Sequence, residues 1–506
     1  MSVDSALPES TGRIITVSTS DNLQSTLEEA GPGDVIELEP GVVYRGPFTL
    51  PKKDGSDWII IRTADPEGKL PQPGSRVSPN DAVSMARLES RRGSVVTAAP
   101  GAARYRFVGI EFGPEAGRFI NNLIDLGSGS KTLEEVPSYI VFDRCLIRGD
   151  RKVGGRRGIA MNSAHTAVIH SHISDFKEVG ADSQAIAGWN GPGPFKIVNN
   201  YLEGAGENVM FGGADPRIPG LVPSDIEIRG NHFSKPLSWR GRGNSRSGAE
   251  WTVKNLFELK NARRVLIEGN LFENNWVHGQ DGTAILFTVR NQDGNSPWSV
   301  VEDVQFVNNV VRRSGNGVTI LGNDNNYKSK TTQRILISNN VFYDIGPDWG
   351  RGVFLLLLDG TIDVVVENNT IRQAHNIILS SDERPHRGFV FSRNIVEHND
   401  YGIIASGKGF GIPTLEEYFP ESVVGDNIIV GGSKRHYPKG NVFPISSKDV
   451  GFKSEKLSDY RLLARNDSPV DGARTSSAGA DYYKLCSAFS THSSRKVDFL
   501  SCSAIE

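Results

Sequence analysis

One short ending recurs down this chain and constrains the fold more than any other feature. Each copy is an apolar strand-like segment followed by Asn, a variable residue and an apolar residue, as in the run from Phe195 to Leu202. The separations between the asparagines run from 25 to 39 residues, so the strand is kept in phase while the loops vary. This is the pattern of a solenoid. The asparagines in the slot are Asn200, Asn231, Asn270, Asn309, Asn340, Asn369, Asn394 and Asn427.

The repeated segments read as strands. Those at 226–229, 304–307 and 364–367 are short, rich in β-branched residues and bounded by Gly or Asn. One repeat holds about three such strands, too few to bury an apolar face alone, so the repeats must stack. Stacked rungs lie about 4.8 Å apart. We expect each corner Asn to adopt the left-handed turn and to bond to the Asn of the next rung, forming an internal ladder.

At this point a family resemblance can be named. The repeat resembles the right-handed parallel β-helix of the pectate-lyase-like superfamily over roughly residues 12–450. The resemblance implies an all-β fold, a polysaccharide or oligosaccharide substrate, and a secreted or periplasmic protein. It does not select a reaction, because the superfamily includes lyases, glycoside hydrolases, esterases, epimerases and binding proteins.

The domain organisation follows from where the repeat begins and fades. We predict a short helix from Asp21, with Asp21 as its N-cap and Leu23, Leu27 and Ala30 on one face, which caps the open first rung. Residues 63–105 show no clear strand before Val95 and are expected to be a long loop or a broken rung. The predicted divisions are a flexible N-terminus (1–12), the β-helix (13–450), a closing segment (451–485) and a flexible tail (486–506).

Composition excludes several classes of function. The formal net charge is −3, so no basic field favours nucleic acid. No apolar run reaches the roughly 18 to 20 residues that span a bilayer; the longest, 353–358, is expected to be a buried rung. We expect a monomer. Cys145 is expected to be a small core residue, and Cys486 and Cys502 are candidates for a disulfide near the C-terminus.

Candidate site residues concentrate in the rungs between Lys177 and Gly294, which have the longest and most polar loops. If the rungs align, Asp182 and Gln184 lie over Glu207 and Asn208 at the start of a strand. Carboxylates so placed can act as acid and base or bind a cation. The alternative is that these side chains only cap turns.

The next rung places charges on one side of a strand. In the run 253–261, alternation turns Lys254, Glu258 and Lys260 outward if Phe257 faces the core. Arg263 and Arg264 follow, and such a cationic face would attract an anionic sugar. The alternative is a solvated, salt-bridged strand.

The loop after this rung and the tryptophans complete the set of candidates. His278 could act as a general base, and Arg290 could bind a carboxylate with its guanidinium. Gln280 is a further candidate for substrate binding. Tryptophan rings can stack on sugars or fill loops; those expected to bind substrate are Trp189, Trp239, Trp251 and Trp276.

The hypothesis that best joins these features is β-elimination on an acidic polysaccharide. Lys254 or Lys260 would be the base and Arg290 or Arg264 the carboxylate partner. The run 257–272 is loosely similar to the Glu-x-Lys strand of the alginate lyase and chondroitinase B family, although that family's paired acidic ligands are not both present.

Several alternatives stay open beside the lyase. The carboxylates expected to bind a Ca²⁺ ion, if one is used, are Glu258 and Asp281, with Asp182 and Glu207 as further candidates. An inverting glycoside hydrolase would pair Asp182 with Glu207 or Asp281, about 6.5 to 9.5 Å apart. The third alternative is a glycan-binding or adhesive solenoid without catalysis.

Overall fold

The computed structural model describes residues 3–18, 22–65, 67–241, 248–381, 384–407, 409–463, 478–492 and 502. The chain forms two compact units, Met1–Thr252 and Val253–Glu506, which we call unit 1 and unit 2. Each unit is described by itself. In both, successive strands pass in turn through three parallel sheets, here named A, B and C.

Among its described residues, unit 1 has eight, seven and six strands in its sheets A, B and C, each strand bonded to its neighbours in the order given. Sheet A holds β1 (Ile14–Val17), β2 (Val35–Leu38), β5 (Ile59–Thr63), β8 (Ala103–Val108), β11 (Ser138–Asp143), β14 (Thr166–Ile169), β17 (Phe195–Val198) and β20 (Ser224–Arg229). Sheet B holds β3 (Val43–Arg45), β6 (Ala86–Ser90), β9 (Ile110–Pro114), β12 (Leu146–Arg148), β15 (His172–Phe176), β18 (Tyr201–Gly204) and β21 (His232–Ser234). Sheet C holds β4 (Phe48–Leu50), β7 (Val96–Ala98), β10 (Asn122–Asp125), β13 (Arg157–Ala160), β16 (Gln184–Gly188) and β19 (Glu207–Phe211).

The part of unit 2 that the structure describes repeats the plan, with six strands in each of these three sheets. Sheet A holds β23 (Ala262–Glu268), β26 (Val301–Val307), β29 (Gln333–Ser338), β32 (Ile362–Glu367), β35 (Val390–Ser392) and β38 (Val423–Gly425). Sheet B holds β24 (Leu271–Asn275), β27 (Val310–Ser314), β30 (Val341–Ile345), β33 (Thr370–Gln373), β36 (Ile395–Glu397) and β39 (Ile428–Val430). Sheet C holds β22 (Asn255–Leu259), β25 (Thr283–Thr288), β28 (Asn316–Leu321), β31 (Leu355–Leu358), β34 (Ile378–Ser381) and β37 (Ile403–Ala405). The predicted all-β, right-handed parallel β-helix is confirmed.

The predicted asparagine ladder is present. In unit 2 the amide of Asn340 donates to Asn369 Oδ1 at 3.0 Å, and Asn309 donates to Asn340 in the same way. In unit 1 Asn200 donates to Asn231 at 3.0 Å. We expected the ladder residue to adopt the left-handed turn, and that expectation is wrong. That conformation falls on the residue before it, such as Asn339 with φ 57°, which leaves the ladder side chain buried.

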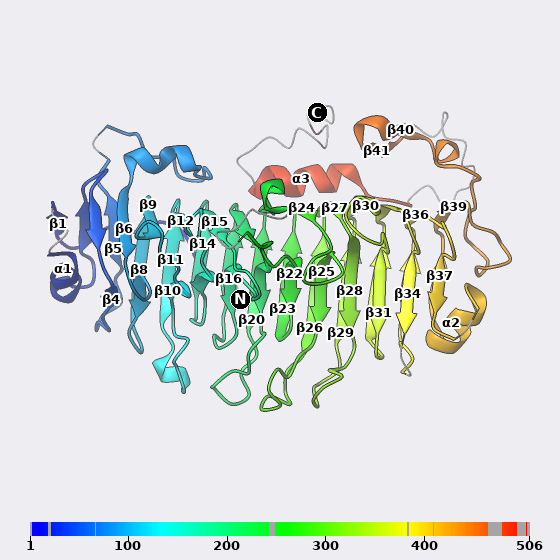
Figure 1. Cartoon of the computed structure of the whole chain (residues 1–506), viewed down its shortest axis with the longest axis horizontal. Helices are drawn as coiled ribbons and strands as arrows, with labels where there is room; N and C mark the ends of the chain where they lie inside the picture. The colour runs from blue at the N-terminus through cyan, green and yellow to red at the C-terminus, as the bar shows by residue number, and fades with distance from the viewer. Residues whose placement is uncertain are drawn as a thin grey trace. The chain divides into compact units, whose positions relative to one another are not determined.

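The N-terminal end of unit 1 carries the expected helix. Helix α1 (Leu23–Glu29) lies beside β1 and β4 (Figure 1). Leu23, Leu27 and Ala30 are buried as predicted. The N-cap is Asn22 rather than Asp21, which lies outside the described residues.

Two expectations for unit 1 are wrong. Residues 3–12, expected to be flexible, are held by the β-helix: Val3 packs against Val141 and Ala167, and Arg106 donates to the carbonyl oxygen of Ser5. The segment 63–105 is not a strandless loop, because β6 forms a regular part of sheet B. Strand β6 is only five residues long and contains charged residues between its buried ones, so its sequence did not stand out as a strand.

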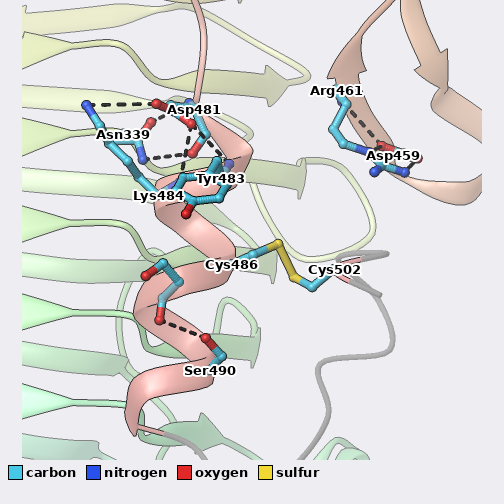
Figure 2. The surroundings of a disulfide bond; sticks show 10 residues. Asn339, Asp459, Arg461, Asp481, Tyr483, Lys484, Cys486, Ser490 and Cys502 are labelled. Atoms are coloured by element: carbon cyan, nitrogen blue, oxygen red, sulfur yellow. Dashed lines mark hydrogen bonds and ion pairs between the residues drawn. A yellow bond between two sulfur atoms is a disulfide. The ribbon is translucent and has the colours of Figure 1, made fainter. Parts of the chain in front are cut away.

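The C-terminal segment of unit 2 covers the outer face of sheet B. It contains β40 (Phe452–Ser454), β41 (Asp459–Leu462) and α3 (Tyr482–His492), which pack on side chains such as Val310 and Val341. The predicted disulfide joins Cys486 to Cys502 (Figure 2). The flexible tail predicted from residue 486 is wrong for residues 486–492, because they belong to α3, whose Leu485 and Phe489 are buried.

The remaining helices are short. They are α2 (Ile412–Tyr418) and the 3₁₀ helices η2 (Pro79–Ser84), η3 (Leu133–Glu135), η4 (Leu237–Trp239), η5 (Ser447–Val450) and η6 (Glu455–Leu457). No helix in the described ranges is long and apolar enough to cross a membrane. Cys145 is fully buried, as predicted, in the corner between β11 and β12.

Candidate functional site

A groove of about 780 Å³ lies on the outer face of sheet C in unit 2. Strands β25, β28, β31 and β34 supply its floor. The loop before β25 and the loops that follow the four strands supply its polar wall. The lining residues are Gln280, Asp281, Thr283, Leu286, Thr288, Arg290, Thr319, Leu321, Asn325, Leu356, Leu358, Asp359, Ser381 and Arg384. A cleft of this volume is in the range in which ligands bind.

The strand register builds the floor of the groove. Leu286 pairs with Thr319 and Thr319 with Leu356, so these three side chains form one outward column. Their neighbours Phe287 and Ile320 point inward and are fully buried. Leu356 therefore faces the groove, and the prediction that the whole segment 353–358 is a buried rung is wrong at this position.

Arg290 stands at the end of β25 and is fixed by a buried carboxylate. Its Nη1 lies 2.7 Å from Asp324 Oδ1 and also donates to Asn325 Oδ1. Asp324 accepts the backbone N–H of Asn291 at 2.7 Å, and its side chain is only 1% exposed. The Arg290 side chain is 27% exposed, so the guanidinium is held in place and still reaches solvent.

Lys260 lies one rung before Arg290 and is fixed in a similar way. Its Nζ lies 3.6 Å from Glu258 Oε1, which also accepts the Thr288 hydroxyl at 3.1 Å. The amide of Asn255 lies 3.4 Å from the other oxygen of Glu258. Because the backbone N–H of Arg290 donates to the carbonyl of Lys260 at 2.9 Å, the two cationic residues leave sheet C at the same edge.

The far end of the groove carries a second guanidinium. Arg384 follows β34, is 62% exposed and lies 3.5 Å from Asp359 Oδ1. At the opposite end, Gln280 accepts from the Asn255 amide at 3.2 Å, and Asp281 is exposed. Sequence reasoning gave the loop of Arg384 less weight than the other candidates and did not identify Asp359, because both loops lie several repeats beyond the polar rungs 177–294.

The outward alternation predicted for β22 is confirmed, but its charged residues are spread out. Phe257 and Leu259 are fully buried, and Lys260 pairs with Glu258, as the salt-bridged alternative predicts. Lys254 precedes β22 and Lys260 follows it, so their backbones stand about 20 Å apart. Only Lys260 lies beside Arg290.

Of the predicted residues of unit 2, Gln280, Asp281 and Arg290 line the groove. Those outside its lining are Lys254, Glu258, Lys260, Arg264, Trp276 and His278. Arg264 is exposed on β23, which belongs to sheet A rather than sheet C. The loop residue His278 is exposed, and its Nδ1 accepts the backbone N–H of Val253 at 3.3 Å. The chain turns the corner between the sheets after Lys260, which sequence spacing did not reveal.

The predicted polar column of unit 1 is shifted by one residue, since Gln184 pairs with Glu207 rather than Asn208, and it is buried. Gln184 and Glu207 are register partners, and the Gln184 amide donates to Glu207 Oε2 at 2.6 Å. Both side chains and Asn208 have no exposed surface. The predicted roles of Gln184, Glu207 and Asn208 in contacting substrate are therefore wrong for this structure, while Asp182 is half-exposed.

Asn208 belongs to a structural network that the sequence did not reveal. Its Oδ1 accepts from the fully buried Lys235 Nζ at 3.1 Å, and Lys235 also donates to the carbonyls of Gly204 and Gly206. Burial lowers the pKa of Lys235 to about 7. The network ties the turn between β18 and β19 to the segment after β21.

The tryptophans do not form the expected sugar platform. Trp239, Trp251 and Trp276 are only 4%, 3% and 4% exposed, which leaves too little ring face for a stacked sugar. Trp189 is half-exposed, with the Arg157 guanidinium 5.1 Å from its ring centroid. None of these four rings lines the groove of unit 2.

The expected Ca²⁺ ligands do not form a carboxylate cluster. Within the described ranges, no group of three or more His, Cys, Asp or Glu side chains is placed to hold a metal ion. Glu258 is 2% exposed and already accepts from Thr288. Asp281 is exposed at the groove.

Comparison with solved structures supports the fold. The chain is similar to a family 6 alginate lyase, AlyGC, with a TM-score of 0.56 and 14% identity over 92% of this chain and 56% of that one. It is also similar to a mannuronic-acid-specific family 6 lyase from human gut microbiota, with a TM-score of 0.51 and 14% identity over 95% and 99%. At this identity the likeness shows the parallel β-helix fold alone.

Sequence comparisons add less. A family model described as "Disaggregatase related" matches residues 301–478, which lie in unit 2. No curated protein matches the sequence. The predicted resemblance to pectate-lyase-like β-helices is confirmed as a resemblance of fold.

Proposed function

We propose that the protein is a polysaccharide lyase that cleaves an acidic, uronic-acid-containing polysaccharide by β-elimination in the groove of unit 2. One observation carries the proposal. Lys260 and Arg290 stand on consecutive rungs at one edge of sheet C, each beside a buried carboxylate that fixes it, Glu258 and Asp324.

The two side chains match the needs of the reaction. In β-elimination a base removes the proton at C5 of a uronate, the electron pair forms the C4–C5 double bond, and the C4–oxygen bond breaks. Lys260 would take the C5 proton in the free-amine form that the step requires, and the released oxygen would be protonated by the lysine or by water. Arg290 would hold the uronate carboxylate and stabilise the charge that moves onto it.

The shape and charge of the groove support an extended anionic chain. The groove follows four consecutive strands and has a guanidinium at each of two places, Arg290 and Arg384. Its floor alternates apolar and hydroxyl side chains, such as Leu356 and Thr319, which suits the mixed surface of a pyranose. Two proteins of similar fold are named as alginate or mannuronic-acid lyases, which agrees with an anionic substrate.

The proposed reaction does not depend on a Ca²⁺ ion, and the requirement for Ca²⁺ is tested in the assay. Glu258 and Asp281 are the carboxylates beside the groove that could contribute to such a site. Activity is therefore measured with Ca²⁺ and with a chelator. Loss of activity in the chelator, with recovery on adding Ca²⁺, would support a bound cation.

The experiment is incubation with a panel of acidic and neutral polysaccharides, following ultraviolet absorbance of the unsaturated product and reducing ends together. A rise in both on an acidic polymer, abolished by Lys260→Met, supports the proposal. Reducing ends without the absorbance would replace it with hydrolysis. Silence in both, with the polymers still bound, would favour a binding solenoid.

A further inference from the structure

A second cleft, of about 450 Å³, lies on the outer face of sheet B in unit 1. Strands β12, β15 and β18 supply one side, and the segment around η4 supplies another. Its lining residues are Pro79, Arg148, Arg151, His172, Ser174, Asp175, Lys177, Tyr201, Glu203, Pro236, Ser238 and Trp239. None of them belongs to the groove of unit 2.

A stacked pair of rings forms part of the cleft wall. His172 and Tyr201 are register partners on β15 and β18, and their ring centroids lie 4.6 Å apart with planes 21° from parallel. Both side chains are half-exposed. The Tyr201 hydroxyl donates to Glu203 Oε1 at 2.7 Å, which fixes the tyrosine ring at the cleft.

Lys177 is a fixed cation at the base of the cleft. It is 4% exposed, and its Nζ lies 2.7 Å from Asp175 Oδ1. The same Nζ lies 5.0 Å from the Trp239 ring centroid and 5.3 Å from that of Trp251. Trp239 and Trp251 thus support the lysine by cation–π contact, rather than stacking on a ligand as predicted from sequence.

The arginines give the cleft an excess of positive charge. Arg148 pairs with the buried Glu111, and it shares that carboxylate oxygen with Arg87, which also pairs with Glu89. Arg151 is exposed in the turn after β12, and its side chain forms no ion pair with any described residue. Arg151 is therefore available to an anion at the cleft mouth.

The acidic residues of the cleft oppose this charge only in part. Asp175 is taken by Lys177. Burial raises the pKa of Glu203 to about 7, against the hydrogen bond from Tyr201. Near neutral pH a large fraction of Glu203 is uncharged, so no acidic residue of the cleft lining balances Arg151.

We propose that this cleft is a second glycan-binding site, which takes one acidic sugar residue of a polysaccharide chain. Arg151 and Arg148 bind its carboxylate or sulfate, and the sugar ring packs beside His172 and Tyr201. Guanidinium groups bind both anions through paired N–H donors, and aromatic rings pack on pyranose faces. The proposal does not require the groove of unit 2 to be catalytic.

Binding is measured with the full chain carrying Lys260→Met, so that cleavage does not consume the ligand. The probes are oligogalacturonate and oligomannuronate (carboxylated), dextran sulfate (sulfated) and dextran (neutral), in affinity gel electrophoresis and calorimetry. The added variants are Arg151→Glu and Tyr201→Ala. The matched control is Arg118→Glu, because Arg118 is an exposed arginine of unit 1 outside the cleft.

We expect Arg151→Glu to weaken binding of an acidic probe by about tenfold or more, the scale of a lost hydrogen bond between charged groups. Tyr201→Ala should also weaken it, Arg118→Glu should not, and dextran should not bind. Comparison of the carboxylated and sulfated probes identifies the anion. Equal losses for Arg151→Glu and Arg118→Glu, or none for Arg151→Glu and Tyr201→Ala, would overturn the proposal. Binding that persists while the parent chain, with Lys260 intact, cleaves none of the acidic polymers would reject the lyase and leave this site standing.

Discussion

The backbone N–H of Arg290 donates to the carbonyl oxygen of Lys260 at 2.9 Å. Stacking of consecutive rungs thus brings together two residues that are thirty positions apart in sequence. Each side chain is fixed by an ion pair with its own carboxylate. Lys260 pairs with Glu258, and Arg290 pairs with Asp324. The pairing is a consequence of the solenoid, and it makes the two side chains separately testable.

Lys260→Met should abolish cleavage of an acidic polysaccharide. The change keeps the length of the side chain and removes the amine, so a proton-transfer contribution of about a hundredfold or more should be lost from kcat. Initial rates and the thermal midpoint are measured together. Lys330→Met, at an exposed position outside the groove, is the control and should keep its rate. An unchanged rate for Lys260→Met would exclude it as the base.

The same assay on Lys254→Met decides between the two lysines proposed from sequence. Lys254 stands before β22 and Lys260 after it. We expect Lys254→Met to retain most of its activity, because the strand separates it from Arg290. A loss confined to Lys254→Met would move the reacting centre to the other end of the strand.

Arg290→Lys should lower kcat/KM by about tenfold or more while preserving the fold. Lysine keeps the charge but cannot form the paired N–H bonds to a carboxylate. Because Asp324 fixes Arg290 through Nη1, Asp324→Asn should produce a smaller loss in the same direction. Arg351→Lys serves as an exposed control of the same type. Equal kinetics for Arg290→Lys and the parent would remove the guanidinium from the mechanism.

Asn340→Ala should destabilise unit 2 by about 2 to 4 kcal/mol. Asn340 donates to the carbonyl of Phe306 and to Asn369, and it accepts from Asn309. Removing it leaves several buried polar groups without partners, each costing about 1 to 3 kcal/mol before relaxation. Urea denaturation measures the change. The control Asn326→Ala, at an exposed site, should shift the midpoint little; similar shifts in both would contradict a ladder contribution.

The sequence was informative where one chemical need repeats at every rung. The side-chain amide at each corner must bond to groups of two rungs at once. Asparagine therefore recurs at the same position of each repeat, and this recurrence predicts the fold. The same repetition located β22 and the outward direction of Glu258 and Lys260. It brought the strands of Gln184 and Glu207 together one residue out of register, because the pattern placed Gln184 over Asn208 and the structure pairs it with Glu207.

Burial and sheet identity were not readable in the same way. The polarity of Glu207 suggested a reactive carboxylate, yet its side chain has no exposed surface. Arg264 follows Lys260 closely in sequence but lies on another sheet. Residues 355–358 are all leucine, so the sequence shows no alternation there. It therefore could not predict that Leu356 lines the groove while Leu355 is buried.

His386 should make unit 2 sensitive to acid. Its ring is fully buried, with Nδ1 accepting the backbone N–H of Thr361 at 3.0 Å and Nε2 lying 3.1 Å from Ser380 Oγ. Burial lowers the pKa of His386 to about 4 from an ordinary value of 6.5. Between these values the unfolded chain binds a proton that the folded chain does not, so stability falls as pH drops from about 6.5 to about 4. The stabilisation is fully present above pH 6.5, and the loss approaches about 3 kcal/mol.

His386→Gln tests this assignment because glutamine cannot titrate. Carboxyl groups also titrate in this pH window. The measurement is therefore the difference in urea midpoint between parent and variant at several pH values from 4 to 7. We expect that difference to shrink as pH falls, since the parent alone loses the histidine contribution. His278→Gln, at an exposed histidine, should give a difference that does not change with pH in this way. Parallel profiles for His386→Gln and the parent would show that His386 is not the group that weakens the fold in acid.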